Sequence, residues 1–191
     1  CRGVGATVRP LLAAGAQIVG GCPHLEDDVA GSTRILLEIA GEAGVGLDLH
    51  TDETLDPTKL GLLELAEQVL ATGFPYPGTA SHCVSLGMVE PDRQRQIAER
   101  VAEAGIIVVA NPDTNLFLQS RPFPTATPRG LTAIAALRAA GVTVAAGSDN
   151  MQDPFNPLGR ADPLDAAGLM VLAGHLLPDD AYDTVAGAAR R

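Results

Sequence analysis

Cysteine is scarce in this sequence and lacks metal-binding spacing. The three cysteines, Cys1, Cys22 and Cys83, form an odd set with no Cys-x-x-Cys pair. This pattern argues against a disulfide framework and against a structural zinc site. We therefore expect a reducing compartment, the cytoplasm, where free thiols are the rule.

Long apolar runs and an excess of basic residues are also missing. No apolar run approaches the roughly 20 residues that a transmembrane helix needs. The start, Cys1-Arg2-Gly3, lacks the charged-then-apolar order of a signal peptide. The formal net charge is −10. We therefore expect no nucleic-acid partner and no binding to an anionic membrane.

Two common signatures of nucleotide binding and catalysis are absent as well. The only glycine pair that resembles a phosphate-binding loop, Gly3-Val4-Gly5, is too short to count. The sequence also lacks the Gly-x-Ser-x-Gly turn that carries a serine nucleophile.

What the chain does contain is a regular alternation of strand-like and helix-like segments. Its 191 residues, 46% of them hydrophobic, are enough to bury one globular core. Continuous apolar runs such as 106–110 are typical of parallel strands buried on both faces. The predicted strands span 17–21, 45–50, 78–82, 106–110 and 142–146.

Helical spacing of apolar residues follows each strand, as at Ile35, Leu36 and Ile39. A glycine follows several of these segments, as is common at helix ends. We read the segment from Asn111 to Pro128 as a long loop, and such loops are usually functional. The predicted helices span 32–43, 57–72, 91–103, 129–140, 162–176 and 179–190.

Five strands, each followed by a helix, predict an α/β fold with a parallel sheet. Two architectures fit. One is an open, flavodoxin-like doubly wound sheet, and the other is five-eighths of a (β/α)8 TIM barrel, which needs ~250 residues in full. No linker or low-complexity stretch divides the chain, so we assign residues 1–191 to part of one domain.

Three of the predicted strands end in a possible metal ligand or proton carrier. His50 and His82 end the second and third strands, and Asp149 follows the fifth. In a β/α barrel, chemistry collects at the C-terminal ends of the strands, so these side chains could share a pocket. The simpler alternatives are structural histidines bonded to backbone and a helix N-cap for Asp149.

Glu53 places a carboxylate three residues beyond His50, in the loop above the same strand. It could carry a proton beside a metal-bound water. The alternative is a solvated loop glutamate, because several aspartates crowd the same region. The segment with Asn111 and Asn115 could supply amide contacts to a ligand.

In combination, five segments resemble the amidohydrolase superfamily and, within it, bacterial cytosine deaminase and its close relatives. Each tetrapeptide alone is a weak signal, but the set is specific and covers nearly the whole chain. The resemblance implies a (β/α)8 barrel of which this chain covers roughly strands four to eight. The segments are Pro23-His24-Leu25-Glu26, His50-Thr51-Asp52-Glu53, Thr79-Ala80-Ser81-His82, Val109-Ala110-Asn111-Pro112 with Asn115, and Gly147-Ser148-Asp149-Asn150 with Asp153-Pro154-Phe155.

The resemblance also implies a mechanism. One divalent ion, iron or zinc, would be held by His50 and Asp149 among other ligands, and a metal-bound hydroxide would add to the ring carbon that bears the amine. Asp149 would take the proton of the hydroxide, Glu53 would carry a proton to the ring nitrogen, and His82 would contact the attacking water. Two further residues, Asn150 and Phe155, would lie near the substrate.

The expected function is hydrolytic deamination of a small cyclic amidine such as cytosine, by an enzyme that we expect to be a homo-oligomer. Departures from the family pattern leave the substrate open. The strand-one His-x-His and an upstream glutamine are absent from these residues, Ser148 replaces a histidine, and Asn150 replaces an aspartate. The alternatives are another C–N bond, in an N-alkylamino triazine or a cyclic amide, and a non-catalytic α/β binding module.

Overall fold

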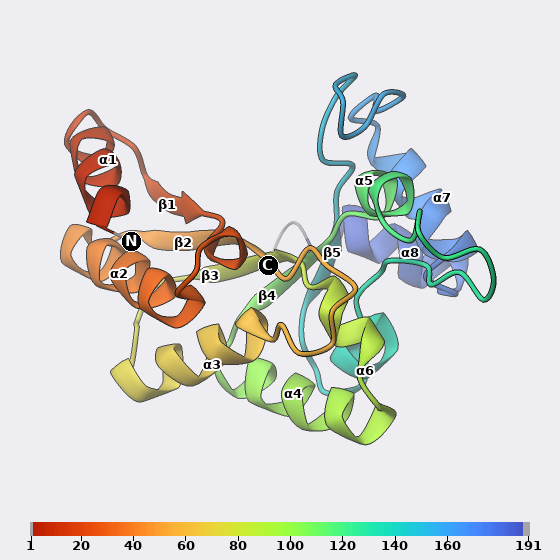
Figure 1. Cartoon of the computed structure of the whole chain (residues 1–191), viewed down its shortest axis with the longest axis horizontal. Helices are drawn as coiled ribbons and strands as arrows, with labels where there is room; N and C mark the ends of the chain where they lie inside the picture. The colour runs from red at the N-terminus through yellow and green to blue at the C-terminus, as the bar shows by residue number, and fades with distance from the viewer. Residues whose placement is uncertain (1, 189–191) are drawn as a thin grey trace.

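The computed structural model describes residues 2–188 (Figure 1). Within them, one parallel sheet contains five strands in the order in which they occur along the chain. All five predicted strands are confirmed, with ends shifted by at most two residues. The strands are β1 (Ile18–Gly21), β2 (Gly46–Thr51), β3 (Gly78–His82), β4 (Ile107–Ala110) and β5 (Val144–Ala146).

The strand order decides between the two predicted architectures. In a doubly wound sheet the order reverses at a switch point, whereas here every strand pairs with the next one along the chain. Right-handed crossovers in such a series place the helices on one face. Figure 1 shows α2 (Val29–Ala43), α3 (Gly61–Thr72), α4 (Pro91–Glu103) and α6 (Ile134–Ala139) along the same side of the sheet. The chain is therefore a run of βα units from a barrel wall.

Other helices flank this run. Helix α1 (Arg2–Ala13) precedes the sheet and has no counterpart among the predictions. The remaining elements are α5 (Pro112–Leu118), α7 (Pro163–Leu172), α8 (Pro178–Val185) and two short 3-10 turns, Pro23–Leu25 and Val84–Met88. The end of the last predicted helix, at 189 and 190, lies outside the described residues. In the described part of the chain, no helix is both long and apolar enough to cross a bilayer.

The core lies between the sheet and its helices, and this leaves the other face for the site. On β2, Leu47 and Leu49 are buried, while Asp48 and His50 alternate with them and point to the opposite face. Apolar residues at helical spacing cover the buried face of the sheet, including Leu36, Ile39, Leu62, Leu65, Ile97 and Val101.

Helix α3 begins at Gly61 rather than at the predicted Pro57. The side chain of Asp56 accepts a hydrogen bond from the backbone N–H of Thr58 at 2.9 Å, which holds a turn there instead. The buried carboxylate of Asp52 then accepts from the N–H groups of Gly61 and Leu62 at 2.8 and 2.9 Å. These first-turn donors have no partner within a helix, so Asp52 fixes where α3 starts.

The region from 111 to 140 also differs from the prediction. Residues 112–118 form helix α5 instead of a loop, with Pro112 at its first turn, where proline is favoured. Helix α6 starts at Ile134 rather than at residue 129, because Gly130 has a φ of +68° that a right-handed helix does not allow. A side chain at Gly130 would also meet Cβ of Gln119 at 2.6 Å. Similarly, α7 ends at Leu172, so His175 lies beyond the end of a helix that was predicted to reach residue 176.

Candidate metal centre

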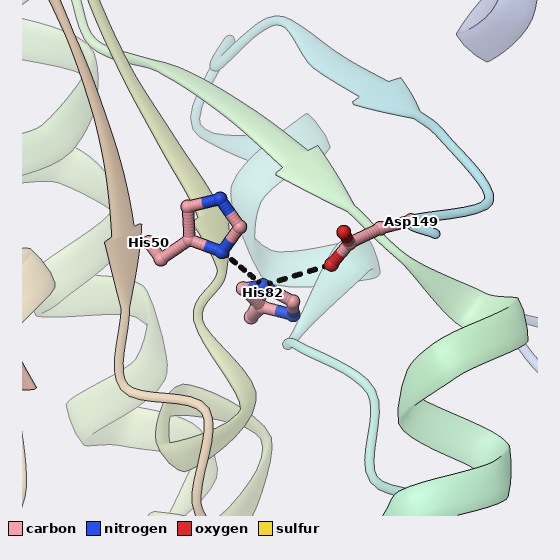
Figure 2. A group of neighbouring side chains, drawn as sticks. All are labelled: His50, His82 and Asp149. Carbon is pink, nitrogen blue, oxygen red and sulfur yellow. Dashed lines mark hydrogen bonds and ion pairs between the residues drawn. The ribbon is translucent and has the colours of Figure 1, made fainter. Parts of the chain in front are cut away.

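Three of the predicted site residues converge at the C-terminal ends of the strands. Figure 2 shows the side chains of His50, His82 and Asp149 pointing toward one another from β2, β3 and the segment after β5. Nδ1 of His50 lies 2.9 Å from Nε2 of His82, and Nε2 of His82 lies 3.2 Å from Oδ2 of Asp149. One possible ligand atom from each residue lies within 4.8 Å of the other two.

Register and a local change of backbone conformation bring the two histidines together. His50 pairs with Ser81 across β2 and β3, and His82 pairs with Thr51. Because side chains alternate along a strand, a fully extended His82 would point with Thr51 toward the helices. Instead, His82 has a φ of +68° and Cys83 a φ of +49°. Such left-handed residues are uncommon without glycine and cluster at functional sites.

One buried side chain holds the backbone on either side of Asp149. Asn156, which is 5% exposed, donates from Nδ2 to the carbonyl oxygens of Ser148 at 3.3 Å and of Asn150 at 3.2 Å. These two carbonyls flank Asp149 in the sequence. The carboxylate of Asp153 accepts from the backbone N–H of Asn156 at 2.9 Å and supports the same turn.

His82 is the most enclosed member of the cluster and has partners on every side. Its Nδ1 lies 3.0 Å from Oδ1 of the buried Asn115 and 3.7 Å from a carboxylate oxygen of Glu53. Nδ2 of Asn111 lies 3.4 Å from Oδ2 of Asp149. Burial lowers the pKa of His82, which the nearby Glu53, Asn115 and Asp149 partly oppose. Burial thus favours the neutral form of the ring, which can accept a proton or donate a lone pair.

The donor set fits a divalent ion. Two imidazole nitrogens 2.9 Å apart repel each other unless a proton or a cation lies between them, and a carboxylate oxygen faces the same point. Imidazole and carboxylate are ligands of both zinc and iron. His50 and Asp149 can serve as ligands while His82 contacts a water beside them.

The predicted substrate residues do not reach this cluster in the described structure. Nδ2 of Asn150 donates to the carboxylate of Asp153 at 2.5 Å. The ring of Phe155 is 54% exposed on the same loop, and its backbone carbonyl accepts from the hydroxyl of Thr114 at 3.0 Å. A role in substrate binding stays a prediction for both residues.

Several residues that support the centre were not predicted. Nδ1 of His24 bonds to the carbonyl of His50 at 2.9 Å, and buried Asp52 anchors the loop that follows β2. Burial raises the pKa of Asp52, while its bonds from the N–H groups of Leu62 and Gly61 lower it. The sequence assigned Asp52 no role of its own, because two other aspartates, Asp48 and Asp56, lie nearby. Asn156 had no signal beyond its place between Phe155 and Pro157.

Parallel βα units that gather histidines and a carboxylate at their strand ends are the arrangement of a β/α-barrel enzyme. The sequence matches the model of the "Amidohydrolase family" over residues 4–190. This chain belongs to the amidohydrolase family.

The chain is also similar to individual deaminases. The chain is 39% identical over 171 residues to a pterin deaminase of Rhizobium rhizogenes. The matched region covers 88% of this chain and 38% of that protein. Its fold matches a 5-methylcytosine deaminase of Klebsiella pneumoniae with a TM-score of 0.89 at 28% identity, over 97% of this chain and 46% of that one.

An N-isopropylammelide isopropylaminohydrolase of Burkholderia multivorans matches with a TM-score of 0.80 at 29% identity, over 97% of this chain and 46% of that one. These neighbours are amidohydrolase TIM barrels, and they confirm the predicted fold. The chain spans less than half the length of each relative.

Proposed function

We propose that this chain carries part of the active site of a metal-dependent hydrolase that deaminates a small heterocycle. The substrate would bear its amine on a ring carbon next to a ring nitrogen, as cytosine and pterin do. The convergence of His50, His82 and Asp149, with Glu53 at 3.7 Å from His82, carries this proposal. Residues 1–191 would then belong to a single hydrolase barrel.

Each residue would have a defined task. A divalent ion held by His50 and Asp149 would lower the pKa of water and so supply a nucleophile at neutral pH. Asp149 would take the proton released as the oxygen attacks the ring carbon. Glu53 would deliver a proton to the ring nitrogen and then to the departing ammonia.

The position of Glu53 suits a proton carrier. Its side chain is 22% exposed, so it can reach a substrate, and its carboxylate faces His82. Its backbone carbonyl accepts from the amide of Gln119 at 3.2 Å, which fixes the loop without occupying the carboxylate. His82 would orient the attacking water through Nε2, the nitrogen nearest Asp149.

A second candidate is hydrolysis of an N-alkylamino triazine. The Burkholderia relative, whose name specifies an isopropylaminohydrolase, is as similar in sequence as the 5-methylcytosine deaminase. Ammonia release from cytosine, isocytosine, pterin and creatinine, and amine release from N-isopropylammelide, would separate the two. Release from none of them by the metal-loaded protein would contradict both.

The Glu53→Gln variant tests the mechanism. We expect turnover to fall by about 10³-fold or more, because general acid–base groups commonly contribute 10²–10⁴-fold, while the bound metal per chain stays unchanged. Glu103→Gln is the matched control, since Glu103 lies at the end of α4 and bonds to Arg100. Near-normal activity in Glu53→Gln would remove Glu53 from the reaction.

A further inference from the structure

A cavity of about 550 Å³ lies beside the metal centre, between the loop after β1 and the loop after β2. Its lining includes His24 and Glu53. His24 bonds to the backbone of His50, and Glu53 faces His82. Glu53 therefore belongs both to the lining of the cavity and to the surroundings of the cluster.

The cavity is large enough to bind a small molecule, since such sites commonly measure about 300–1,000 Å³. A heterocycle that reacts at the metal centre would lie on the other side of Glu53. The cavity is thus free to hold a part of the same molecule that extends away from the reacting carbon.

The walls define the chemistry of that part. The lining includes the apolar side chains of Val29, Leu60 and Leu63, with Leu25 at 76% exposure. It also includes three carboxylates, Glu53, Asp56 and Glu64, and one lysine, Lys59. The fourth carboxylate, Asp52, already accepts two backbone hydrogen bonds. Such a lining favours a neutral, partly apolar group with hydroxyls and disfavours an anionic one.

We infer that this cavity binds a neutral substituent of the substrate and so selects amino-heterocycles larger than a bare pyrimidine. This inference rests on the proposed function for the identity of the ring, but binding can be measured without turnover. Suitable probes are pterin, 6-hydroxymethylpterin and 6-carboxypterin, which share one fused ring system and differ in the substituent at position 6.

Two matched variants separate the cavity from the rest of the protein. Ala30 lines the cavity in the first turn of α2 and is exposed. Ala30→Trp would fill the space with little change to the core. Ala43 is exposed at the far end of the same helix, about 20 Å away at 1.5 Å per residue, so Ala43→Trp is the control. Ala30→Leu is a smaller second variant in case the tryptophan prevents folding.

Binding is measured by quenching of pterin fluorescence in the metal-free protein, and kcat/KM in the metal-loaded protein. In the wild type we expect 6-hydroxymethylpterin to bind about tenfold more tightly than pterin, the low end of what one extra group gains in a pocket. We expect 6-carboxypterin to bind no more tightly than pterin, because its substituent is an anion. Ala30→Trp should remove the preference and leave pterin within about twofold, whereas Ala43→Trp should keep it.

The outcomes are distinguishable. The expected order in binding, without turnover of any pterin or of the other amines named above, would contradict the proposed function and leave the cavity assignment intact. Equal affinity for the three pterins in the wild type would overturn the cavity assignment, as would an equal loss in Ala30→Trp and Ala43→Trp. If pterin were turned over but the substituent raised neither the binding affinity nor kcat/KM, the proposed function would stand and the cavity assignment would be wrong.

Discussion

The two sides of the candidate metal centre are built differently. On the side of β2 and β3, buried side chains support the site, including Asp52, which is 2% exposed, and His82, which is 1% exposed. On the side of β5, Asp149 lies in a loop with exposed apolar side chains, among them Met151 and Leu158. The buried Asn156 holds the carbonyls on either side of Asp149, and the buried Thr114 bonds to the carbonyl of Phe155.

This difference shows how one fold can keep its reaction and vary its substrate. Groups that hold a metal or move a proton must stay within fractions of an ångström, so they require packed support. Groups that contact only the far parts of a substrate tolerate a mobile setting, and loops commonly supply them. Asn150 and Phe155, the predicted substrate residues, both belong to the exposed side.

The largest effect should come from removing a ligand, on either side. We expect His50→Ala and Asp149→Ala each to lower metal content and to reduce turnover by about 10³-fold or more, because the reaction needs an activated water. Asp179→Ala, at an exposed position in the first turn of α8, is the control. Full metal occupancy in either ligand variant, measured by elemental analysis, would contradict its role.

The next effect concerns the buried support of His82. Asn115 is fully buried, and its Oδ1 lies 3.0 Å from Nδ1 of His82. A group that orients a catalytic histidine in this way commonly contributes about 10–100-fold. We expect Asn115→Leu to lower kcat by this factor with little change in KM.

Asn115→Asp, which keeps an acceptor oxygen at the same place, should recover much of the lost kcat. A loss of equal size in both Asn115 variants would point to a packing defect. A rise in KM alone would place Asn115 at the substrate rather than behind His82.

The elements of this fold were largely predictable, because apolar runs and helical spacing report burial directly. The strands were found to within two residues, and the side chains of His50, His82 and Asp149 lie together as the strand ends suggested. The sequential strand order was not predictable from the residues alone, since both open sheets and barrels alternate strand and helix.

Several details that the sequence did not predict depend on contacts between residues six to eleven positions apart. Asp52 caps α3 nine residues away, and this contact moved the predicted helix start. Gly130 has a positive φ, and Gln119 occupies the space that a side chain there would need. Asn156 bonds to two carbonyls of another part of its loop. No local pattern encodes such pairs.

Asp52 tests the stability of the packed side. Asp52→Ala would leave the buried N–H groups of Gly61 and Leu62 without an acceptor, at a cost of about 2 kcal/mol in the free energy of unfolding. Asp52→Asn keeps one acceptor oxygen and should lose less. Urea unfolding measures both variants, and Asp56→Ala is a control from the same loop. If Asp52→Ala lowered the free energy of unfolding no more than the control does, water would replace the carboxylate as the hydrogen-bond acceptor.

The smallest effect should come from Asn156, on the exposed side. Asn156→Ala frees the carbonyls of Ser148 and Asn150, but water can reach this loop, so the free energy of unfolding should fall by only about 1 kcal/mol. Because these carbonyls flank Asp149, we expect metal affinity to drop a few-fold while the fold persists. Competition with a chelator measures that affinity. If Asn156→Ala instead lowered the free energy of unfolding as much as Asp52→Ala does, the two sides of the centre would contribute equally to the stability of the fold.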